Sequence, residues 1–319
     1  MRAAGRKAGG CIAFFAVFFT VMMLTHPRES TAITLKGLVH LKSVIPAVFP
    51  YLVLSGLLLK SGLDAKIALF TGGLFEKVFK LPRAAFPVFM AGILCGFPVG
   101  ARCSAELFAS GGCTERDADR LSAMCNFCSP PFLITVVGAK LMNSASAGWL
   151  LFGLQTFFAL AFGFFYRRPT GSVRANACAR KRARDAFREE DVSFGIIPAA
   201  IGDAALQTLR ICGIVLFFSV LSGVAALPFA ERLRARPELL GLLYGFFEFS
   251  SGCLSLTPGA DAACYAALIT GFSGLSVLAQ CATFLVPSGV SMKGWLCAHL
   301  LCPLLTSLSL FLFKTAGIL

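Results

Sequence analysis

The chain alternates long apolar runs with short charged segments, and the lengths of those runs predict the fold. Residues 147–166, 211–230 and 294–313 contain no Asp, Glu, Lys or Arg. A helix of about 20 apolar residues crosses the ~30 Å hydrocarbon core of a bilayer. Each of these three runs therefore predicts a membrane-spanning helix.

The N-terminal part predicts two further spans. Residues 11–25 form an apolar helix that ends before Pro27, and residues 43–59 form a second span. Between them, residues 30–43 mix apolar and basic side chains, which is typical of a helix lying along the membrane surface. Basic residues before the first helix are also typical of a signal peptide, so cleavage of this helix stays open. Residues 60–83 predict a basic loop.

Four other apolar runs are interrupted in the middle by Gly, Pro or polar residues. They are residues 84–107, 121–139, 239–256 and 262–286. Irregular backbone at membrane depth occurs only where it is buried in protein or lines a water-filled cavity. Secondary transporters place their substrate sites at such broken helices. The four runs thus predict half-helices that meet around a site inside the membrane.

The order of elements repeats on either side of a hydrophilic linker, residues 167–192. We expect an N-terminal transmembrane helix (1–28), a first repeat (29–166) and, after the linker, a second repeat (193–319). Each repeat has a surface helix, a span, two broken runs and a final span. Internal repeats of this kind are common in transporters. The predicted fold class is an all-α polytopic membrane protein.

Basic segments orient the predicted spans. The N-terminus, residues 60–83 and residues 167–188 are basic, the last with eight Lys and Arg, and all three are placed in the cytoplasm. Residues 43–59 then run inward and residues 211–227 run outward, so the two repeats are inverted. For residues 147–166 to end in the cytoplasm, one of the two broken runs before them must be re-entrant.

The composition agrees with a membrane protein. Hydrophobic residues make up 57% and charged residues 14% of the 319 residues, and the mean hydropathy is +0.78. Soluble domains carry about 25% charged residues. The net charge of +13 has its largest cluster in the linker. We therefore predict contact with an anionic lipid membrane and no nucleic-acid partner.

Cysteines and histidines do not predict a metal centre. Most of the 13 cysteines lie in apolar runs, where they act as small hydrophobes. Cys125 and Cys128 form the single C-x-x-C pair, and His26, His40 and His299 are far apart in sequence. We predict no metal, no cofactor and no disulfide framework. Since the chain has no G-x-S-x-G, H-E-x-x-H or Walker sequence, we also predict that it is not an enzyme.

Charged residues lie near the breaks of two of these runs, Arg102 in the first and Glu248 in the third. A cation such as Arg102 costs about 2.5–3.5 kcal/mol inside a membrane on insertion scales. It therefore predicts an anionic substrate, which Arg102 and the N-termini of half-helices would bind together. The alternative is that Arg102 snorkels to the membrane interface beside Glu106, one turn further on. Glu248 occupies the matching place in the second half. It predicts a proton carrier, a cation ligand or a partner for Arg102, and the alternative is a structural bridge to a basic residue.

Uncharged polar side chains lie at the same breaks. They suit hydrogen bonds to a substrate or coordination of sodium, although each alone also fits a contact between two helices. The glycines and prolines beside them predict the backbone interruptions. The predicted substrate-binding residues are Gly96, Phe97, Pro98, Gly100, Arg102, Asn126, Ser129, Pro130, Glu248, Ser251, Gly252, Ser273, Gly274, Ser276 and Gln280.

Four short motifs follow one another along the chain: Gly96-Phe97-Pro98-Val99-Gly100-Ala101-Arg102, Cys125-Asn126 with Pro130 and Phe132, Phe247-Glu248-x-x-x-Gly252, and Gly274-Leu275-Ser276-Val277-x-x-Gln280. In this order they resemble the YlbJ, or SpoVV-type, family of sporulation integral membrane proteins, which contain nucleoside-recognition gate domains. The resemblance covers residues 43–313. Phe127 and Ser129 depart from the family's Asn-Asn-x-Gly-Pro-like pattern.

The resemblance implies a transporter in the outer forespore membrane that moves dipicolinic acid toward the spore. Dipicolinate is a small, flat dianion, which suits Arg102 and helix N-termini. A coupling proton or sodium ion is expected, and a homodimer stays open. The gate domains keep nucleosides or nucleobases as alternative substrates. A third hypothesis, of another class, is a membrane scaffold that recruits partners through the basic linker.

Overall fold

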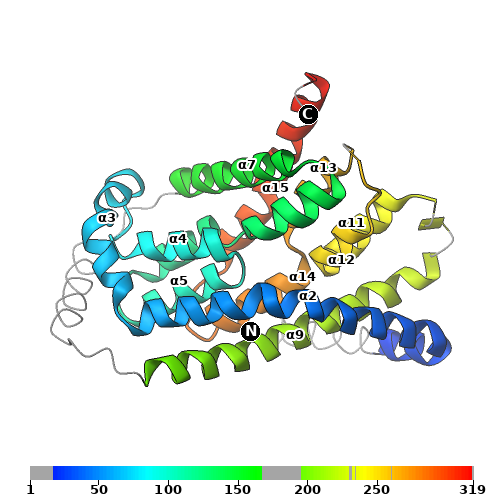
Figure 1. The fold of residues 1–319 in the computed structure, drawn as a ribbon, viewed down its shortest axis with the longest axis horizontal. Coiled ribbons are helices and arrows are strands. Elements are labelled where there is room, and N and C mark those ends of the chain that lie inside the picture. The colour runs from blue at the N-terminus through cyan, green and yellow to red at the C-terminus, as the bar shows by residue number, and fades with distance from the viewer. Residues whose placement is uncertain (1–16, 167–194, 230–231, 234, 260, 318–319) are drawn as a thin grey trace, which may run out of the picture.

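The computed structural model describes residues 17–166, 195–229, 232–233, 235–259 and 261–317. Within these ranges all regular elements are helices (Figure 1). Five of the described helices are long and apolar enough to cross a membrane. The prediction of an all-α polytopic membrane protein is therefore confirmed. The predicted linker and the first part of the N-terminal helix lie outside the described residues.

The helices pack as a long bundle with two outer pairs and a broken-helix core. In chain order they are α2 (Pro27–Lys60), α3 (Leu63–Phe79), α4 (Ala85–Cys95), α5 (Val99–Ala109), α6 (Glu115–Cys125), the π-helix η1 (Phe132–Leu141), α7 (Ala145–Phe165), α9 (Ile196–Ala226), the short turn η2 (Leu227–Phe229), α11 (Pro237–Phe247), α12 (Phe249–Leu254), α13 (Ala262–Phe272), α14 (Gly274–Leu285) and α15 (Lys293–Thr315).

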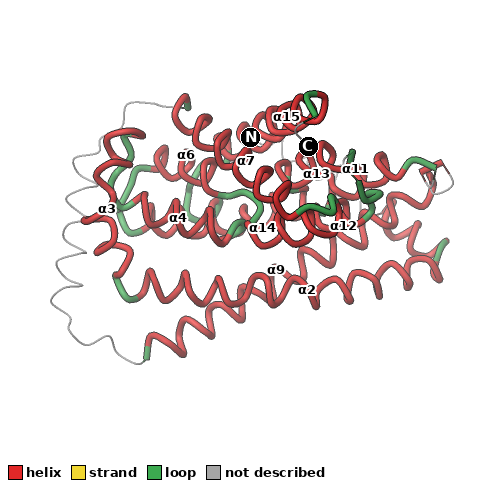
Figure 2. Tube along the Cα trace, turned by 45° about the horizontal axis from the view of Figure 1, so that its top comes forward, coloured by secondary structure: helices red, strands yellow, loops and turns green. Residues whose placement is uncertain are grey.

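The longest helices, α2 and α9, lie side by side and run in opposite directions (Figures 1 and 2). A side chain at Gly56 would meet Ala200, and one at Gly223 would meet Ile33. These pairings, from opposite ends of both helices, show that α2 and α9 are antiparallel. Small residues let two membrane helices approach closely.

The predicted surface helix over residues 30–43 is wrong, because it continues into the next span as part of α2. Its less exposed face, with Ile33 and Gly37, packs against α9 and does not lie along lipid headgroups. Pro46 and Pro50 lie inside α2 without ending it. Membrane helices tolerate proline because neighbouring groups can satisfy the backbone carbonyls that it frees. In the second half, α9 likewise joins its predicted surface segment and span.

The predicted basic loop over residues 60–83 is also wrong, because most of it forms α3. Gly62 has a positive φ of 69°, which turns the chain between α2 and α3. In α3, the ring of Phe75 lies 5.7 Å from Phe86 and 5.2 Å from Phe89, both in α4. Burial of these rings holds α3 against the bundle, and a count of lysines along the segment could not reveal it.

The first broken run in each half is a re-entrant hairpin. In one hairpin α4 packs against α5, and in the other α11 packs against α12. Figure 1 shows the hairpins entering from opposite ends of the molecule, with their turns toward its middle. The second broken run in each half crosses the molecule: α6 continues into η1, and α13 into α14. The hairpins are therefore the re-entrant elements that the charge pattern required.

The final spans, α7 and α15, form a second antiparallel pair. A side chain at Gly294 would lie 3.0 Å from the ring of Tyr166. One end of α15 thus meets the opposite end of α7, and farther along α15 the Cys302 thiol donates to the Phe158 carbonyl (3.5 Å). Because both long pairs are antiparallel, the two halves are inverted relative to one another. Helix α3 has no counterpart in the described part of the second half.

Candidate functional site

The turns of the two hairpins meet in the middle of the bundle. The ring of Phe97, in the first turn, packs edge-on against Phe249, in the second, with centroids 4.8 Å apart. Phe249 also contacts Phe132 at the start of η1 (5.1 Å). Three aromatic rings thus join breaks that are far apart in sequence, as expected for half-helices that meet inside a membrane.

The first turn is held by the break that follows α6. The Phe97 amide donates to the Phe127 carbonyl at 3.0 Å. Gly96 has a φ of 73°, and a β-carbon there would lie 2.7 Å from the Ser129 amide nitrogen. Glycine is required here for both its backbone conformation and its lack of a side chain. Pro98 then precedes the first residue of α5.

Two glycines clamp the end of α6 between the limbs of the first hairpin. A β-carbon at Gly92, in α4, would lie 2.3 Å from the Cys125 carbonyl oxygen, and one at Gly100, in α5, would lie 2.4 Å from it. Any larger residue would collide with backbone. The sequence singled out Gly100 and missed Gly92, which lies inside an otherwise regular apolar helix.

Asn126 joins both halves of the chain. Its Oδ1 accepts a hydrogen bond from the Ala101 amide in the first turn of α5 (3.0 Å). Its Nδ2 donates to the Cys281 sulfur in α14 (2.9 Å). The side chain is fully buried, so both contacts are shielded from water. It caps α5 from a distance of 25 residues in sequence.

The sequence pattern suggested no structural role for His299, which was weighed only as a possible metal ligand. It lies in α15, with Nε2 2.9 Å from the Asn126 carbonyl oxygen and Nδ1 2.9 Å from the Trp295 carbonyl oxygen. A neutral imidazole has one N–H, so it can donate to only one of these carbonyls. The ring stacks on Phe127 and Trp295. A single buried histidine in an apolar span gives no sequence signal for such a position.

The structure does not bring Arg102 and Glu248 together as a pair. Arg102 Nε donates to Glu106 Oε1 at 2.8 Å, and Nη1 lies 3.4 Å from the Leu52 carbonyl oxygen in α2. The guanidinium is buried, whereas the Glu106 side chain is 41% exposed. The Arg102–Glu248 ion pair, one of the alternatives predicted for Glu248, is therefore wrong, and the buried Arg102 is paired with Glu106 instead.

Glu248 caps its own hairpin. It is fully buried between α11 and α12. Oε1 accepts from the Ser250 amide (3.2 Å) and Oε2 from the Ser251 amide (2.7 Å), while the Ser250 hydroxyl donates to both oxygens at 2.8 Å. A carboxylate at a helix N-terminus satisfies free amides and interacts favourably with the helix dipole. No basic residue is needed to hold this charge.

The remaining predicted residues of the second half lie along the α13–α14 break and the second hairpin. Ser273 and Gly274 both have positive φ, and a β-carbon at Gly274 would lie 2.8 Å from the Gly245 carbonyl oxygen in α11. A β-carbon at Gly252 would lie 2.4 Å from the Gly245 Cα. Ser276, in the first turn of α14, is fully buried, and its hydroxyl has no hydrogen-bond partner among the residues that the structure describes.

The other three predicted residues lie at separate places, in α14, beside α9 and before η1. Gln280, one turn after Ser276, is buried, and its backbone carbonyl accepts from the Thr283 hydroxyl (2.6 Å). The Ser251 hydroxyl lies 3.5 Å from that of Ser219 in α9. Pro130 is the first helical residue after the break, two residues before η1.

The fold and the meeting of its four breaks define an all-α polytopic membrane protein with inverted halves and re-entrant hairpins. No family model matches the chain, and no solved structure matches it. The chain is 27% identical over 324 residues to the sporulation integral membrane protein YlbJ of Bacillus subtilis (strain 168). This match covers 91% of the chain and 79% of that protein. It confirms the resemblance to the YlbJ family and supports a sporulation-related, multi-pass membrane protein.

Proposed function

We propose that the protein is a secondary transporter of a small organic anion. The observation that carries this proposal is the meeting of two oppositely directed hairpins, where Phe97 and Phe249 pack at the centre of the bundle. Inverted repeats whose broken helices meet near the midplane are the arrangement that secondary transporters use to bind a substrate and open to either side.

The N-terminus of α14 is the best position for the substrate's carboxylate. Asn126 already caps α5, and Glu248 already caps α12. No side chain caps α14, and the unpartnered Ser276 hydroxyl lies in its first turn. A helix N-terminus offers free amides and the positive end of the dipole to an anion. Substrate binding would supply the hydrogen-bond acceptor that Ser276 lacks.

The particular substrate that we propose is dipicolinate, moved toward the forespore across its outer membrane. The name of the Bacillus relative supports a link to sporulation, and the resemblance to its family suggests the substrate. A proton or sodium ion would drive the movement. His299 is a second candidate for the coupling proton beside Glu248, because only its protonated ring donates to both nearby carbonyls.

The test is uptake of labelled dipicolinate into proteoliposomes under imposed pH or sodium gradients. Ser276→Ala is expected to lower uptake about tenfold, the effect of losing one buried hydrogen bond of about 1.4 kcal/mol. Gly213→Ala is the control, because nothing lies within 4 Å of a β-carbon there. Absence of uptake under every gradient would contradict the proposal.

Arg102 needs a separate comparison, since it is paired with Glu106. Arg102→Gln and the double variant Arg102→Gln/Glu106→Gln are measured together. If Arg102 acts only on the structure, the double variant transports better than the single one, because no unpaired charge is left. If Arg102 also binds substrate, both variants lose uptake equally.

A nucleoside is the second candidate substrate. The observation in its favour is that the charges of Arg102 and Glu248 are already paired or capped, which leaves uncharged groups such as Ser276 at the breaks. An excess of unlabelled nucleoside that blocks uptake, where unlabelled dicarboxylates do not, would favour it. The scaffold hypothesis predicts instead that deletion of residues 167–192 abolishes function while Glu248→Ala is silent.

A further inference from the structure

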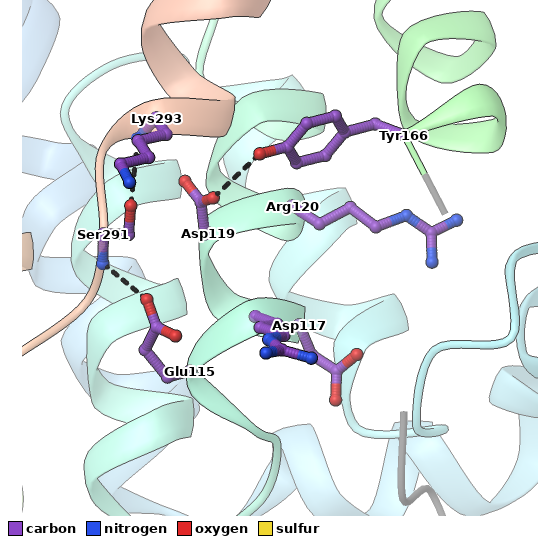
Figure 3. A pocket seen from close by; sticks show the side chains of 8 residues that line it. Glu115, Asp117, Asp119, Arg120, Tyr166, Ser291 and Lys293 are labelled. Carbon is purple, nitrogen blue, oxygen red and sulfur yellow. Dashed lines mark hydrogen bonds between the residues drawn. The ribbon is translucent and has the colours of Figure 1, made fainter. Parts of the chain in front are cut away.

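A pocket of about 280 Å³ lies beside Tyr166, the last described residue before the linker (Figure 3). It lies between α6, Tyr166 at the end of α7, and the segment that begins α15. Helix α6 is not among the apolar spans. Three cationic and three carboxylate side chains line the pocket, and none of them belongs to the predicted substrate site. The basic linker places this end in the cytoplasm.

Two of the carboxylates are engaged by backbone amides. Glu115 Oε1 accepts from the Ser291 amide at 3.0 Å, which ties α6 to the segment before α15. Asp117 Oδ2 accepts from the amide and hydroxyl of Thr114 at 3.2 and 2.7 Å, in the capping box of α6. These charges are therefore offset locally by helix N-terminal groups.

Asp119 is the third carboxylate, and it lies at the junction of the three elements. Its oxygens accept from the Gly294 amide at 2.9 and 3.1 Å, and the Tyr166 hydroxyl donates to it at 3.4 Å (Figure 3). Burial raises the pKa of this carboxyl to about 6, and the nearby charge of Glu115 acts in the same direction. Asp119 therefore changes charge close to neutral pH.

The three cations come from α6 and from the start of α15. Arg116 and Lys293 are exposed at the rim, and neither makes an ion pair within the described part of the chain. Arg120 is buried, and its Nε donates to the Gly163 carbonyl at 2.6 Å. Figure 3 shows Lys293 and Arg120 on opposite sides of the Asp119 carboxyl. The pocket thus presents positive charge from two sides.

We propose that this pocket binds a small dicarboxylate anion between Arg116, Arg120 and Lys293, and that Asp119 takes up a proton when the anion binds. The choice of a dicarboxylate rests on the proposed function, whereas the affinity for an anion rests on the lining. The site would lie on the cytoplasmic access path, outside the central breaks.

The charge balance explains the coupling. Asp119 faces Glu115, Arg116 and Arg120 from its own helix, Tyr166 from the end of α7, and Lys293 from α15. With Asp119 ionised, three cations face three carboxylates. A proton from water on Asp119 leaves three cations facing two carboxylates, and the protonated oxygen can then donate to the Tyr166 hydroxyl. The anion and the proton therefore favour each other's binding.

Calorimetric titration of the detergent-purified full chain with pyridine-2,6-dicarboxylate tests this inference. Between pH 7.5 and pH 5.5 the affinity is expected to rise by up to about 25-fold, the limit when only the protonated form of a group with pKa about 6 binds. The neutral pyridine-2,6-dicarboxamide is expected not to bind. Equal binding of the two compounds would overturn the anion site.

Variants separate the two parts of the proposal. Asp119→Asn is expected to bind tightly at both pH values, and a full pH dependence in this variant would overturn the proton coupling. Arg116→Gln/Lys293→Gln is expected to weaken binding at least tenfold. Lys140→Gln, an exposed lysine outside the pocket, is the matched control. Unchanged affinity in the double variant would overturn the proposal that Arg116 and Lys293 bind the anion.

A lipid headgroup is the other source of an anion at this position. Titration in phosphatidylglycerol nanodiscs is compared with titration in phosphatidylcholine nanodiscs. Loss of dicarboxylate binding only in phosphatidylglycerol would overturn the soluble ligand in favour of the headgroup. Failure of the proposed function is distinguishable, since it would abolish proteoliposome uptake while leaving binding in this pocket intact.

Discussion

The two re-entrant hairpins share a shape but are stabilised in different ways. The first is locked to its neighbours: Gly92 and Gly100 close on the Cys125 carbonyl of α6, and Asn126 caps α5 from the next break. The second has its cap within itself, because Glu248 caps its own second limb and Gly252 packs on Gly245 in the same hairpin, while Gly274 of the α13–α14 break also closes on the Gly245 carbonyl.

This difference indicates which hairpin can move alone. Displacing the first hairpin would break its hydrogen bonds to the α6–η1 break, those of the Phe97 amide with the Phe127 carbonyl and of the Ala101 amide with Asn126. The cap of the second hairpin lies within it, so a displacement of this hairpin leaves the cap intact. In the proposed transport cycle we therefore expect the second hairpin to move before the first.

The largest expected effect comes from filling the glycines. Gly100→Ala and Gly252→Ala each place a β-carbon 2.4 Å from backbone, and each should lower the free energy of unfolding by about 3 kcal/mol. Gly100→Ala should expose Cys125 to a thiol reagent, whereas Gly252→Ala should expose Cys253 and leave Cys125 protected. The measurement is thermal unfolding and thiol labelling in detergent.

Gly213→Ala is the control for these variants, because it has open space around it. It should leave the stability unchanged or raise it slightly, since alanine favours helix. If Gly252→Ala exposed Cys125 as readily as Gly100→Ala does, the two hairpins would not differ in the way described.

The caps give the next largest effect. Asn126→Ala and Glu248→Ala leave buried amides without acceptors, and each should cost about 2 kcal/mol of unfolding free energy. Asn126→Ala should be non-additive with Cys281→Ala, because their contact joins the two halves. Glu248→Ala should be additive with Cys281→Ala. Double-mutant cycles by thermal unfolding measure both, and strong Glu248–Cys281 coupling would argue against an autonomous second hairpin.

The two partners of the ion pair in α5, Arg102 and Glu106, should lower the free energy of unfolding by different amounts when each is substituted. Glu106→Gln leaves the buried Arg102 guanidinium without its carboxylate and should cost about 1–2 kcal/mol of unfolding free energy. Arg102→Gln should cost less, because the Glu106 side chain is 41% exposed and water can solvate it. Thermal unfolding of the two single variants tests the order, and the reverse order would mean that Glu106 does not hold Arg102.

The smallest effect is a dependence of stability on pH. The pKa of Asp119 is raised from 3.8 to about 6 in the folded protein. The contribution of its protonated form to the free energy of unfolding is therefore fully present below about pH 4, and it is lost as the pH rises through 6. Asp119→Asn should match wild type at pH 4 and be more stable than wild type at pH 7.5. Melting temperatures at both pH values test this, and a variant less stable at pH 7.5 would refute the sign.

The interruptions of the helices could be predicted because their causes are local. Gly96 and Gly274 supply positive φ, and Thr114 and Ser144 supply N-caps. The partners of buried charges could be proposed only as alternatives. Arg102 had Glu106 within one turn and Glu248 at the equivalent break, and both satisfied the sequence pattern. Glu106 is within reach because residues i and i+4 share a helix face. Whether Glu248 also comes close depends on how the two hairpins pack, which is a tertiary property.

By itself, the sequence determined the membrane class, the four breaks and the inversion of the halves, because run length, glycine and charge act through the nearest residues and through the bilayer. Only the tertiary structure decided that the hairpins are held differently. Gly92 and His299 look ordinary in sequence, and they matter because the Cys125 and Asn126 carbonyls come to lie beside them. Such contacts join residues that are far apart along the chain, and no local preference records them.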